Sequence, residues 1–246
     1  GVTFADDSIP GIDLIYPDPG FLLEKKKNLL GIVLTHAHED HIGSVAVIWP
    51  ELKCKIYATP FTAELVSQKF KEKKIDITNY LEIVQLNGKI KLNEFEIEFI
   101  TLTHSILEPN GLSIKTPVGI VLHTGDWKCD PNPLIGEKVD EKKLKEIGNQ
   151  NVLAMICDST NVFNEGRAGS ESDVRESLLN IIAKQKKKII VTTFASNVAR
   201  METIFYCAKK TNRQISLVGR SMHRIYKAAR QCGYLQNLIE PVDPRD

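Results

Sequence analysis

Three apolar runs in this chain each end in side chains that can bind a metal ion, and this pattern most constrains the fold. The run Leu29 to Thr35 leads into the cluster His36-Ala37-His38-Glu39-Asp40-His41, while "FITLT" ends at His104 and "GIVLHTG" ends at Asp126. Short apolar runs bounded by polar residues are typical of buried strands. We therefore expect a fold in which three strand ends bring these side chains to one rim.

The histidine cluster has a spacing that suits two metal ions. His36 and His38 are two residues apart, so in an extended segment their side chains point the same way and can hold one ion. Asp40 and His41 follow where the chain turns into a helix, and they can face a second ion. Imidazole and carboxylate suit Zn²⁺ or Mn²⁺. The alternative is a solvated histidine-rich loop, which the position directly after a buried strand disfavours.

Composition limits the class of protein. The chain has 246 residues, of which 42% are hydrophobic and 26% are charged, enough for one large domain or two modest ones. No segment reaches the roughly 18 apolar residues that a membrane helix needs. The five cysteines are scattered and form no Cys-x-x-Cys pair, which argues against a disulfide framework. We expect a cytoplasmic protein without a membrane segment.

Charge and pattern divide the chain into two parts. Residues 1–165 contain 17 Lys+Arg against 24 Asp+Glu, whereas residues 166–246 contain 15 against 7. An acidic part suits cations and a basic part suits a polyanion, although chance segregation of solvated charge is an equal alternative. From Val152 onwards strand-like and helical runs alternate, as in βαβ units on a parallel sheet. We place a first domain at residues 1–165 and a second at residues 166–246.

The expected elements follow from periodicity and helix signals. A helix from Ser44 should stop at Pro50, "VLAMICD" should be a buried strand, and a helix should begin after Ser170 with Asp173 in a capping box. Extended runs "KIIVTTF" and "QISLVG" are expected as strands. The remaining expectations are a helix at Phe61–Lys74, a half-exposed strand at Glu94–Leu102, and two strands joined by a turn within Gly111–Thr124.

Polar groups in the second part are candidates for phosphate binding. Ser196 and Asn197 precede one helix, and Arg220 and Ser221 begin another. Free N–H groups and the macrodipole favour anions at such ends, and Arg200 and Arg220 can grip phosphate with two hydrogen bonds. The alternative is that Ser and Asn are simply good N-caps.

Several other charged or histidine residues are interpreted as structural. His123 lies three residues before Asp126 and is expected to pack near the metal site without being a ligand. His223 and the lysine runs at 25–27 and 186–188 are expected on the solvated surface.

Six short motifs together resemble a known family. "THAHEDH", "THS" at 103–105 and "HTGD" at 123–126 resemble the metallo-β-lactamase fold in its two-metal form. "CDSTN" at 157–161, "TFASNVAR" at 193–200 and "GRSM" at 219–222 resemble the β-CASP branch. With "GIDLIYPD" near the start, the set is most similar to bacterial ribonuclease J over nearly the whole chain. The resemblance implies an α/β protein, with an αββα sandwich followed by part of a β-CASP parallel α/β domain.

The resemblance also implies ligands and cofactors. One ion would be held by His36, His38 and His104, and a second by Asp40 and His41, with Asp126 bridging the two. Asp40, His41 and Asp126 would form the catalytic centre, and Asp158, in the first β-CASP acidic motif, would support the metal shell. The implied cofactors are two divalent ions, Zn²⁺ first and Mn²⁺ as the alternative.

The implied function is hydrolysis of RNA phosphodiester bonds by a metal-activated hydroxide, internally and from the 5′ end. The expected substrate is 5′-monophosphorylated RNA, and the full-length enzyme is expected to be a homo-oligomer. Because the family pattern continues past both ends, the chain is expected to be incomplete at both ends. Two alternatives remain open: another hydrolase of the same fold, or a non-catalytic RNA-binding fragment.

Overall fold

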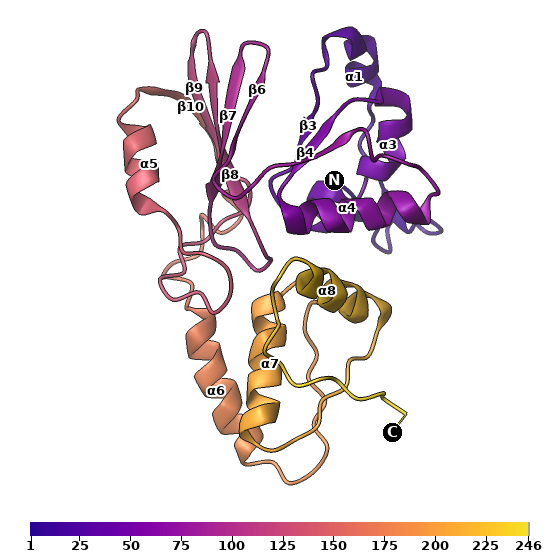
Figure 1. The fold of residues 1–246 in the computed structure, drawn as a ribbon, viewed down its shortest axis with the longest axis vertical. Helices are drawn as coiled ribbons and strands as arrows, with labels where there is room; N and C mark the ends of the chain where they lie inside the picture. The colour runs from indigo at the N-terminus through magenta and orange to yellow at the C-terminus, as the bar shows by residue number, and fades with distance from the viewer. Residues whose placement is uncertain (246) are drawn as a thin grey trace.

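The structure, a computed structural model that describes residues 1–245, has a two-sheet body above a lobe of helices (Figure 1). The strands are β1 (Thr3–Phe4), β2 (Leu14–Ile15), β3 (Ile32–Val33), β4 (Ile56–Ala58), β5 (Leu81–Ile83), β6 (Lys89–Leu92), β7 (Phe95–Thr101), β8 (Asn110–Thr116), β9 (Gly119–His123) and β10 (Val152–Ile156). The helices are α1 (Gly20–Glu24), η1 (Lys26–Asn28), α2 (Glu39–Ile42), α3 (Val45–Leu52), α4 (Pro60–Glu72), α5 (Glu141–Gly148), α6 (Glu171–Ala183), α7 (Val198–Lys210) and α8 (Arg220–Gln231).

Two sheets face each other between outer helices. The larger sheet has the order β10-β9-β8-β7-β6, with only β9 and β10 parallel, and the smaller sheet is the parallel set β3-β4-β5. Val33 and Tyr57 of the smaller sheet pack against Phe99 and Leu112 of the larger one, so an apolar layer lies between the sheets. Helix α5 inserts Ile147 into a cluster on the larger sheet. These contacts build the αββα layering that the family resemblance implies.

The apolar side of α4 covers the smaller sheet. Phe61, Leu65 and Phe70 are buried with Ile56 of β4, and Pro60 occupies the first turn, where its missing N–H costs no helical bond. The predicted helix at Phe61–Lys74 is therefore confirmed within two residues. The predicted strand at Glu94–Leu102 and the pair around the turn after Thr116 are also confirmed, as β7 and as β8 with β9.

Two predictions for the first part are wrong in detail. Helix α3 does not stop at Pro50 but continues to Leu52, because the buried side chains of Trp49 and Leu52 hold the last turn in place despite the missing N–H. Strand β10 exists, but Leu153 and Met155 are exposed rather than buried. The reason is position, because β10 is the edge strand of its sheet.

The second part is helical between its extended segments. The predicted capping box of α6 is confirmed, with Ser170 and Asp173 exchanging side-chain and backbone hydrogen bonds. The segments 188–194 and 214–219, predicted as strands, belong to no strand within residues 1–245. A strand needs a hydrogen-bonded neighbour, and the backbones of these two segments are not bonded to each other. Their apolar side chains Ile190, Phe194 and Val218 consequently remain exposed.

The two parts are in direct contact. Helix α8 packs across α4, and Arg224 of α8 forms an ion pair with Glu72 of α4, with Nη1 and Oε1 2.8 Å apart. No helix within residues 1–245 is both long and apolar enough to cross a membrane.

Candidate metal centre and adjoining cleft

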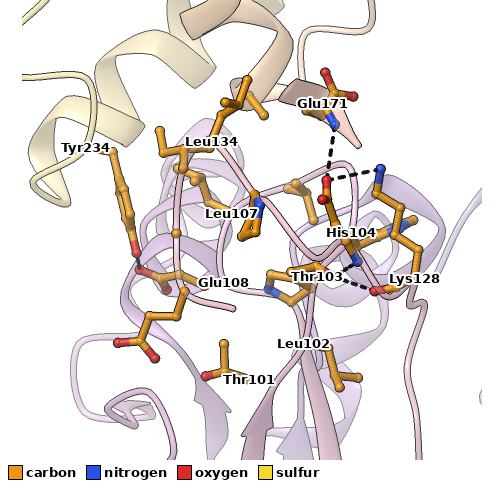
Figure 2. Close-up of a pocket in the computed structure, with 18 of the residues that line it drawn as sticks. Thr101, Leu102, Thr103, His104, Leu107, Glu108, Lys128, Leu134, Glu171 and Tyr234 are labelled. Atoms are coloured by element: carbon orange, nitrogen blue, oxygen red, sulfur yellow. Dashed lines mark hydrogen bonds and ion pairs between the residues drawn. The ribbon is translucent and has the colours of Figure 1, made fainter. Parts of the chain in front are cut away.

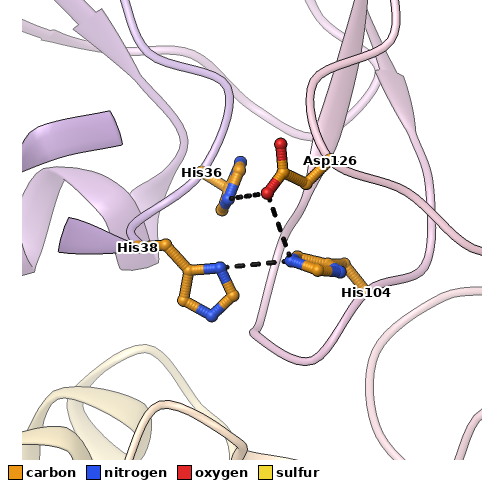
Figure 3. A group of neighbouring side chains, drawn as sticks. All are labelled: His36, His38, His104 and Asp126. Atoms are coloured by element: carbon orange, nitrogen blue, oxygen red, sulfur yellow. Dashed lines mark hydrogen bonds and ion pairs between the residues drawn. The ribbon is translucent and has the colours of Figure 1, made fainter. Parts of the chain in front are cut away.

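Three loops at the ends of strands converge on one point (Figure 3). The loop after β3 carries His36 and His38, the loop after β7 carries His104, and the loop after β9 carries Asp126. The three loops follow three different strands of the sandwich. Side chains that are up to 90 residues apart in sequence therefore meet in space. The predicted common rim is present.

The converging side chains form two groups that share one carboxylate. One ligand atom each from His36, His38, His104 and Asp126 lies within 4.8 Å of the others, and the same holds for Asp40, His41 and Asp126. Nε2 of His41 lies 3.2 Å from Oδ1 of Asp126, and Nε2 of His36 lies 3.8 Å from Oδ2. The two oxygens of Asp126 therefore face the two groups separately.

His36 has a nitrogen that lacks a partner in the protein. The side chain is fully buried, its Nδ1 lies 3.1 Å from Oγ1 of Thr35, and its Nε2 has no hydrogen-bond partner within residues 1–245. Burial, and then repulsion from His41, His38 and His104, lowers the pKa of His36 to about 2, so the ring is neutral at neutral pH. A neutral, orphaned Nε2 directed at other ligand atoms fits a metal ion.

The other two histidines of this group are neutral for the same reason. Burial, followed by repulsion from His104, lowers the pKa of His38 to about 4. Burial also lowers the pKa of His104, against the opposing effect of Asp126. Nε2 of His104 lies 3.2 Å from Nδ1 of His38. Metal ligation requires unprotonated imidazole, so the set is ready to bind without first losing protons.

The loops are fixed by Asn110 and Gly125, whose roles the sequence analysis missed, and by His123, which it placed near the metal site. Asn110 of β8 is fully buried, and its Nδ2 donates to the carbonyl of Thr35 at 3.2 Å and to that of Glu108 at 2.6 Å. Gly125 has a φ of +57°, and a Cβ there would lie 2.8 Å from the carbonyl oxygen of Asn110, so only glycine fits. The Gly125 N–H donates to Nδ1 of His123, which explains that histidine as a loop support.

Asp158 lies beside the centre without touching it. Its Oδ1 accepts hydrogen bonds from the backbone N–H and the hydroxyl of Thr160, and these bonds lower its pKa. It lines an open hollow together with His41 and Asp126. No hydrogen bond joins it to a candidate ligand within residues 1–245, so any support of the metal shell acts through charge or through the loop.

A cleft of about 580 Å³ joins the metal centre to the second part of the chain. Its lining includes His38, Asp40 and His104 on one side and Ser196, Asn197 and Ser221 on the other. Three of the five predicted phosphate-binding residues therefore reach the same space as the candidate ligands. Lys69 of α4 and Arg224 of α8 also line this cleft. They are far apart in the sequence, and no local sequence pattern predicted that they share a cleft.

Arg200, Asn197 and Arg220 differ in their surroundings. Arg200 forms two hydrogen bonds to the carboxylate of Glu171, at 3.1 and 3.2 Å, so its charge is neutralised. Asn197 is the N-cap of α7, with its side chain accepting from the Arg200 N–H at 2.9 Å. Arg220 begins α8 and is exposed outside the lining of the cleft. His223 is exposed, as predicted.

A second, small cavity of about 30 Å³ lies behind His104, where the two parts meet (Figure 2). Its lining includes Glu108 and Tyr234, and the Tyr234 hydroxyl donates to Oε1 of Glu108 at 3.1 Å. The other carboxylate oxygen accepts from the backbone N–H of Phe61, at the start of α4, at 2.8 Å. The cavity is too small for substrate, and its polar residues tie elements together.

Comparison with known proteins identifies the family. Residues 10–144 match the beta-lactamase superfamily domain, and residues 186–243 match the ribonuclease J beta-CASP domain. The chain belongs to the beta-lactamase superfamily. It has the predicted fold class, a metallo-β-lactamase domain followed by a β-CASP domain.

Curated relatives match almost the whole chain. Ribonuclease J of Sinorhizobium meliloti is 41% identical over 97% of this chain and 42% of its own length, and that of Corynebacterium glutamicum is 38% identical over 96% and 33%. The chain thus spans less than half the length of these relatives. A solved protein of unknown function from Enterococcus faecalis matches 87% of this chain and 53% of its own with a TM-score of 0.57, at 17% identity, which shows a shared fold.

Proposed function

We propose that this ribonuclease J-type chain carries the hydrolytic centre of a metal-dependent ribonuclease. The observation that carries the proposal is the pair of ligand groups that share Asp126 at the mouth of a cleft. Two divalent ions bound by these residues would supply a nucleophile at neutral pH and would stabilise the charge that develops on phosphorus. Zn²⁺ is the first candidate and Mn²⁺ the alternative, since histidine and carboxylate accept either.

Each of these side chains would have a separate role. His36, His38 and His104 would hold the first ion, and Asp40 and His41 the second, with Asp126 bridging. The neutral imidazoles need lose no proton to bind, and burial of His36 keeps water from one side of the site. Ser196, Asn197 and Ser221 would orient the RNA backbone from the opposite wall of the cleft.

The substrate side of the proposal rests on the relatives and on charge. Ribonuclease J relatives and the basic second part both fit RNA. We propose cleavage from the 5′ end and internally, a preference for 5′-monophosphorylated RNA, a homo-oligomeric full-length protein, and a cytoplasmic location. We also propose that residues 1–165 and 166–246 form separate domains.

Substitution of Asp126 tests the proposal. In the full-length protein, Asp126→Asn should abolish RNA cleavage, because the amide cannot bridge two cations, while RNA binding stays within a few fold. Cleavage of a 5′-labelled RNA, RNA affinity and metal content per chain are measured. The exposed Asp7→Asn serves as the matched control and should leave all three unchanged.

The outcomes separate the alternatives. Retained cleavage by Asp126→Asn would contradict the assignment of Asp126. Hydrolysis of a thioester without cleavage of RNA would favour another hydrolase of this fold. RNA binding that survives chelation, with no cleavage by the metal-loaded wild type, would favour a non-catalytic RNA-binding role.

A further inference from the structure

A dense group of cations lies at the end of the lobe that is farthest from the metal centre. Helices α6 and α7 run side by side, and both end at the lower tip of the molecule (Figure 1). We call this group the basic tip, and it comprises Lys184, Lys186, Lys187, Lys188, Lys209, Lys210 and Arg213. All six lysines are exposed. The sequence run 186–188 alone looks like ordinary solvated surface, but the fold adds cations from a second helix.

The register of the two helices explains why the cations meet. Glu171 at the start of α6 binds Arg200 in the first turn of α7, and Arg175 one turn later bonds to Thr203. The helices are therefore parallel, each 13 residues long, and their C-terminal ends coincide. Arg213 then donates to the backbone carbonyls of Gln185 and Lys187, which fixes the lysine loop against the end of α7.

The positive charge of the basic tip is not compensated. Between Ser177 and Ile239 the only acidic residue is Glu202. Its carboxylate is paired with Arg175, which also lies over the ring of Tyr206. No ion pair joins a cation of the basic tip to a carboxylate anywhere in residues 1–245. Cations near helix C-termini interact favourably with the macrodipole, but that effect fades beyond the last turn and does not account for Lys186 to Lys188.

We propose that the basic tip is a second RNA-binding surface, which contacts the phosphates of a strand whose other end lies in the cleft. This inference rests on the proposed function, because it takes RNA as the ligand. The tip is about 20 Å from the cleft wall at Asn197, given a rise of about 1.5 Å per residue along α7. Unpaired lysine charge recognises a polyanionic backbone without reading its sequence. The surface should therefore favour long RNA over short RNA, irrespective of sequence.

Charge reversal tests the surface directly. We compare the wild-type full chain with a triple variant, Lys186→Glu, Lys187→Glu and Lys188→Glu, by fluorescence anisotropy with single-stranded RNA, in chelator so that no cleavage occurs. The triple variant should bind RNA of about 30 nucleotides about tenfold or more weakly, and its salt slope should be shallower by about two. Binding of RNA of about 6 nucleotides should be unchanged, because it cannot span both surfaces.

The lysine run 25–27 provides the matched control, with Lys25→Glu, Lys26→Glu and Lys27→Glu, since it carries the same charge on the other part of the chain. An unchanged affinity of the tip variant for long RNA, or a loss equal to that of the control, would overturn the inference. A loss shared by short and long RNA would overturn it too, because the effect would then be on the cleft. Cleavage by metal-loaded wild type is measured separately, so a failure of the proposed function is distinguishable from a failure of this surface.

Discussion

The chemistry of the centre depends on keeping one buried histidine neutral. Nε2 of His36 is buried and has no hydrogen-bond partner within residues 1–245, and such a group costs about 1–3 kcal/mol when nothing bonds to it. Thr35 engages the other ring nitrogen and so fixes which nitrogen faces the ligand group. Burial of His36 therefore lowers the stability of the metal-free protein, and binding of an ion to Nε2 would recover that loss. This is expected of a metal ligand and not of a packing residue.

The neutral state of His36 predicts acid sensitivity of the metal-free protein. Its pKa is about 2 in the folded state, against an unfolded value of about 6.5. Below pH 6.5 the unfolded chain binds a proton that the folded chain does not, so the free energy of unfolding falls as pH falls, by up to about 1.4 kcal/mol per unit. His38, with a pKa of about 4, adds to this loss between pH 6.5 and 4. Urea unfolding of the metal-free protein in chelator, at several pH values between 7 and 5, measures this fall in the free energy of unfolding.

Two variants isolate the contribution of the buried ring. His36→Asn removes one of the titrating groups and should make the unfolding free energy less steeply dependent on pH over that range, with the contribution of His38 remaining. The exposed His223→Asn should leave the dependence as it is in the wild type. An equally steep slope in His36→Asn would show that other groups cause the acid sensitivity.

At the scale of elements, the short helix α2 needs help to hold its ligands. It has only four residues, no side-chain cap, and carries both Asp40 and His41. Its Ile42 is buried, and its Glu39 binds Nζ of Lys69 through both carboxylate oxygens, at 2.8 and 2.6 Å. Since Lys69 belongs to the long, well-packed helix α4, the ion pair fastens the ligand-bearing turn to a rigid support.

Removal of the Lys69 charge should loosen the second metal position selectively. In Lys69→Met the turn loses its fastening, and we expect about a tenfold weaker affinity for the ion at Asp40 and His41, as for other supports of metal ligands. The ion at the three histidines should bind as before. Calorimetric titration of the metal-free protein with Zn²⁺ resolves the two steps.

The control for this change lies on the same helix. Lys71→Met, at an exposed position, should alter neither step, and Lys69→Arg should restore most of the affinity. If Lys69→Met weakens both metal steps equally, the residue acts on general stability and not on the turn.

Elements were predictable where local pattern and local environment agree. The apolar face of α4 and the capping box at Ser170 are local signals, and both elements form as expected. The segments 188–194 and 214–219 have strand-like sequences, but a strand also requires a partner that no local pattern specifies. Pro50 fails as a stop signal because the burial of its neighbours outweighs the lost hydrogen bond.

At the scale of the whole molecule, the site is predictable in its ligands and not in its supports. His36, His38, His104 and Asp126 follow strand-like runs, so their meeting point could be inferred from topology. Asn110, Lys69 and Arg224 act across distances of 30 residues or more, and their residue types are common on any surface. Only the three-dimensional packing of the two parts gives them a role.

The contact between the two parts depends on a buried carboxylate. Glu108 joins the start of α4, through the Phe61 N–H, to Tyr234, which follows α8. The side chain of Glu108 is buried, and a hydrogen bond of this kind contributes about 0.5–1.5 kcal/mol to the free energy of unfolding. Tyr234→Phe should therefore lower the unfolding free energy by that amount, because it removes one donor and leaves the ring in place. Urea unfolding measures this loss, and Tyr16→Phe at an exposed position should show none. Equal stability of Tyr234→Phe and wild type would mean that water replaces the hydroxyl and that the other contacts, such as the packing of α8 on α4 and the ion pair of Arg224 with Glu72, hold the two parts together.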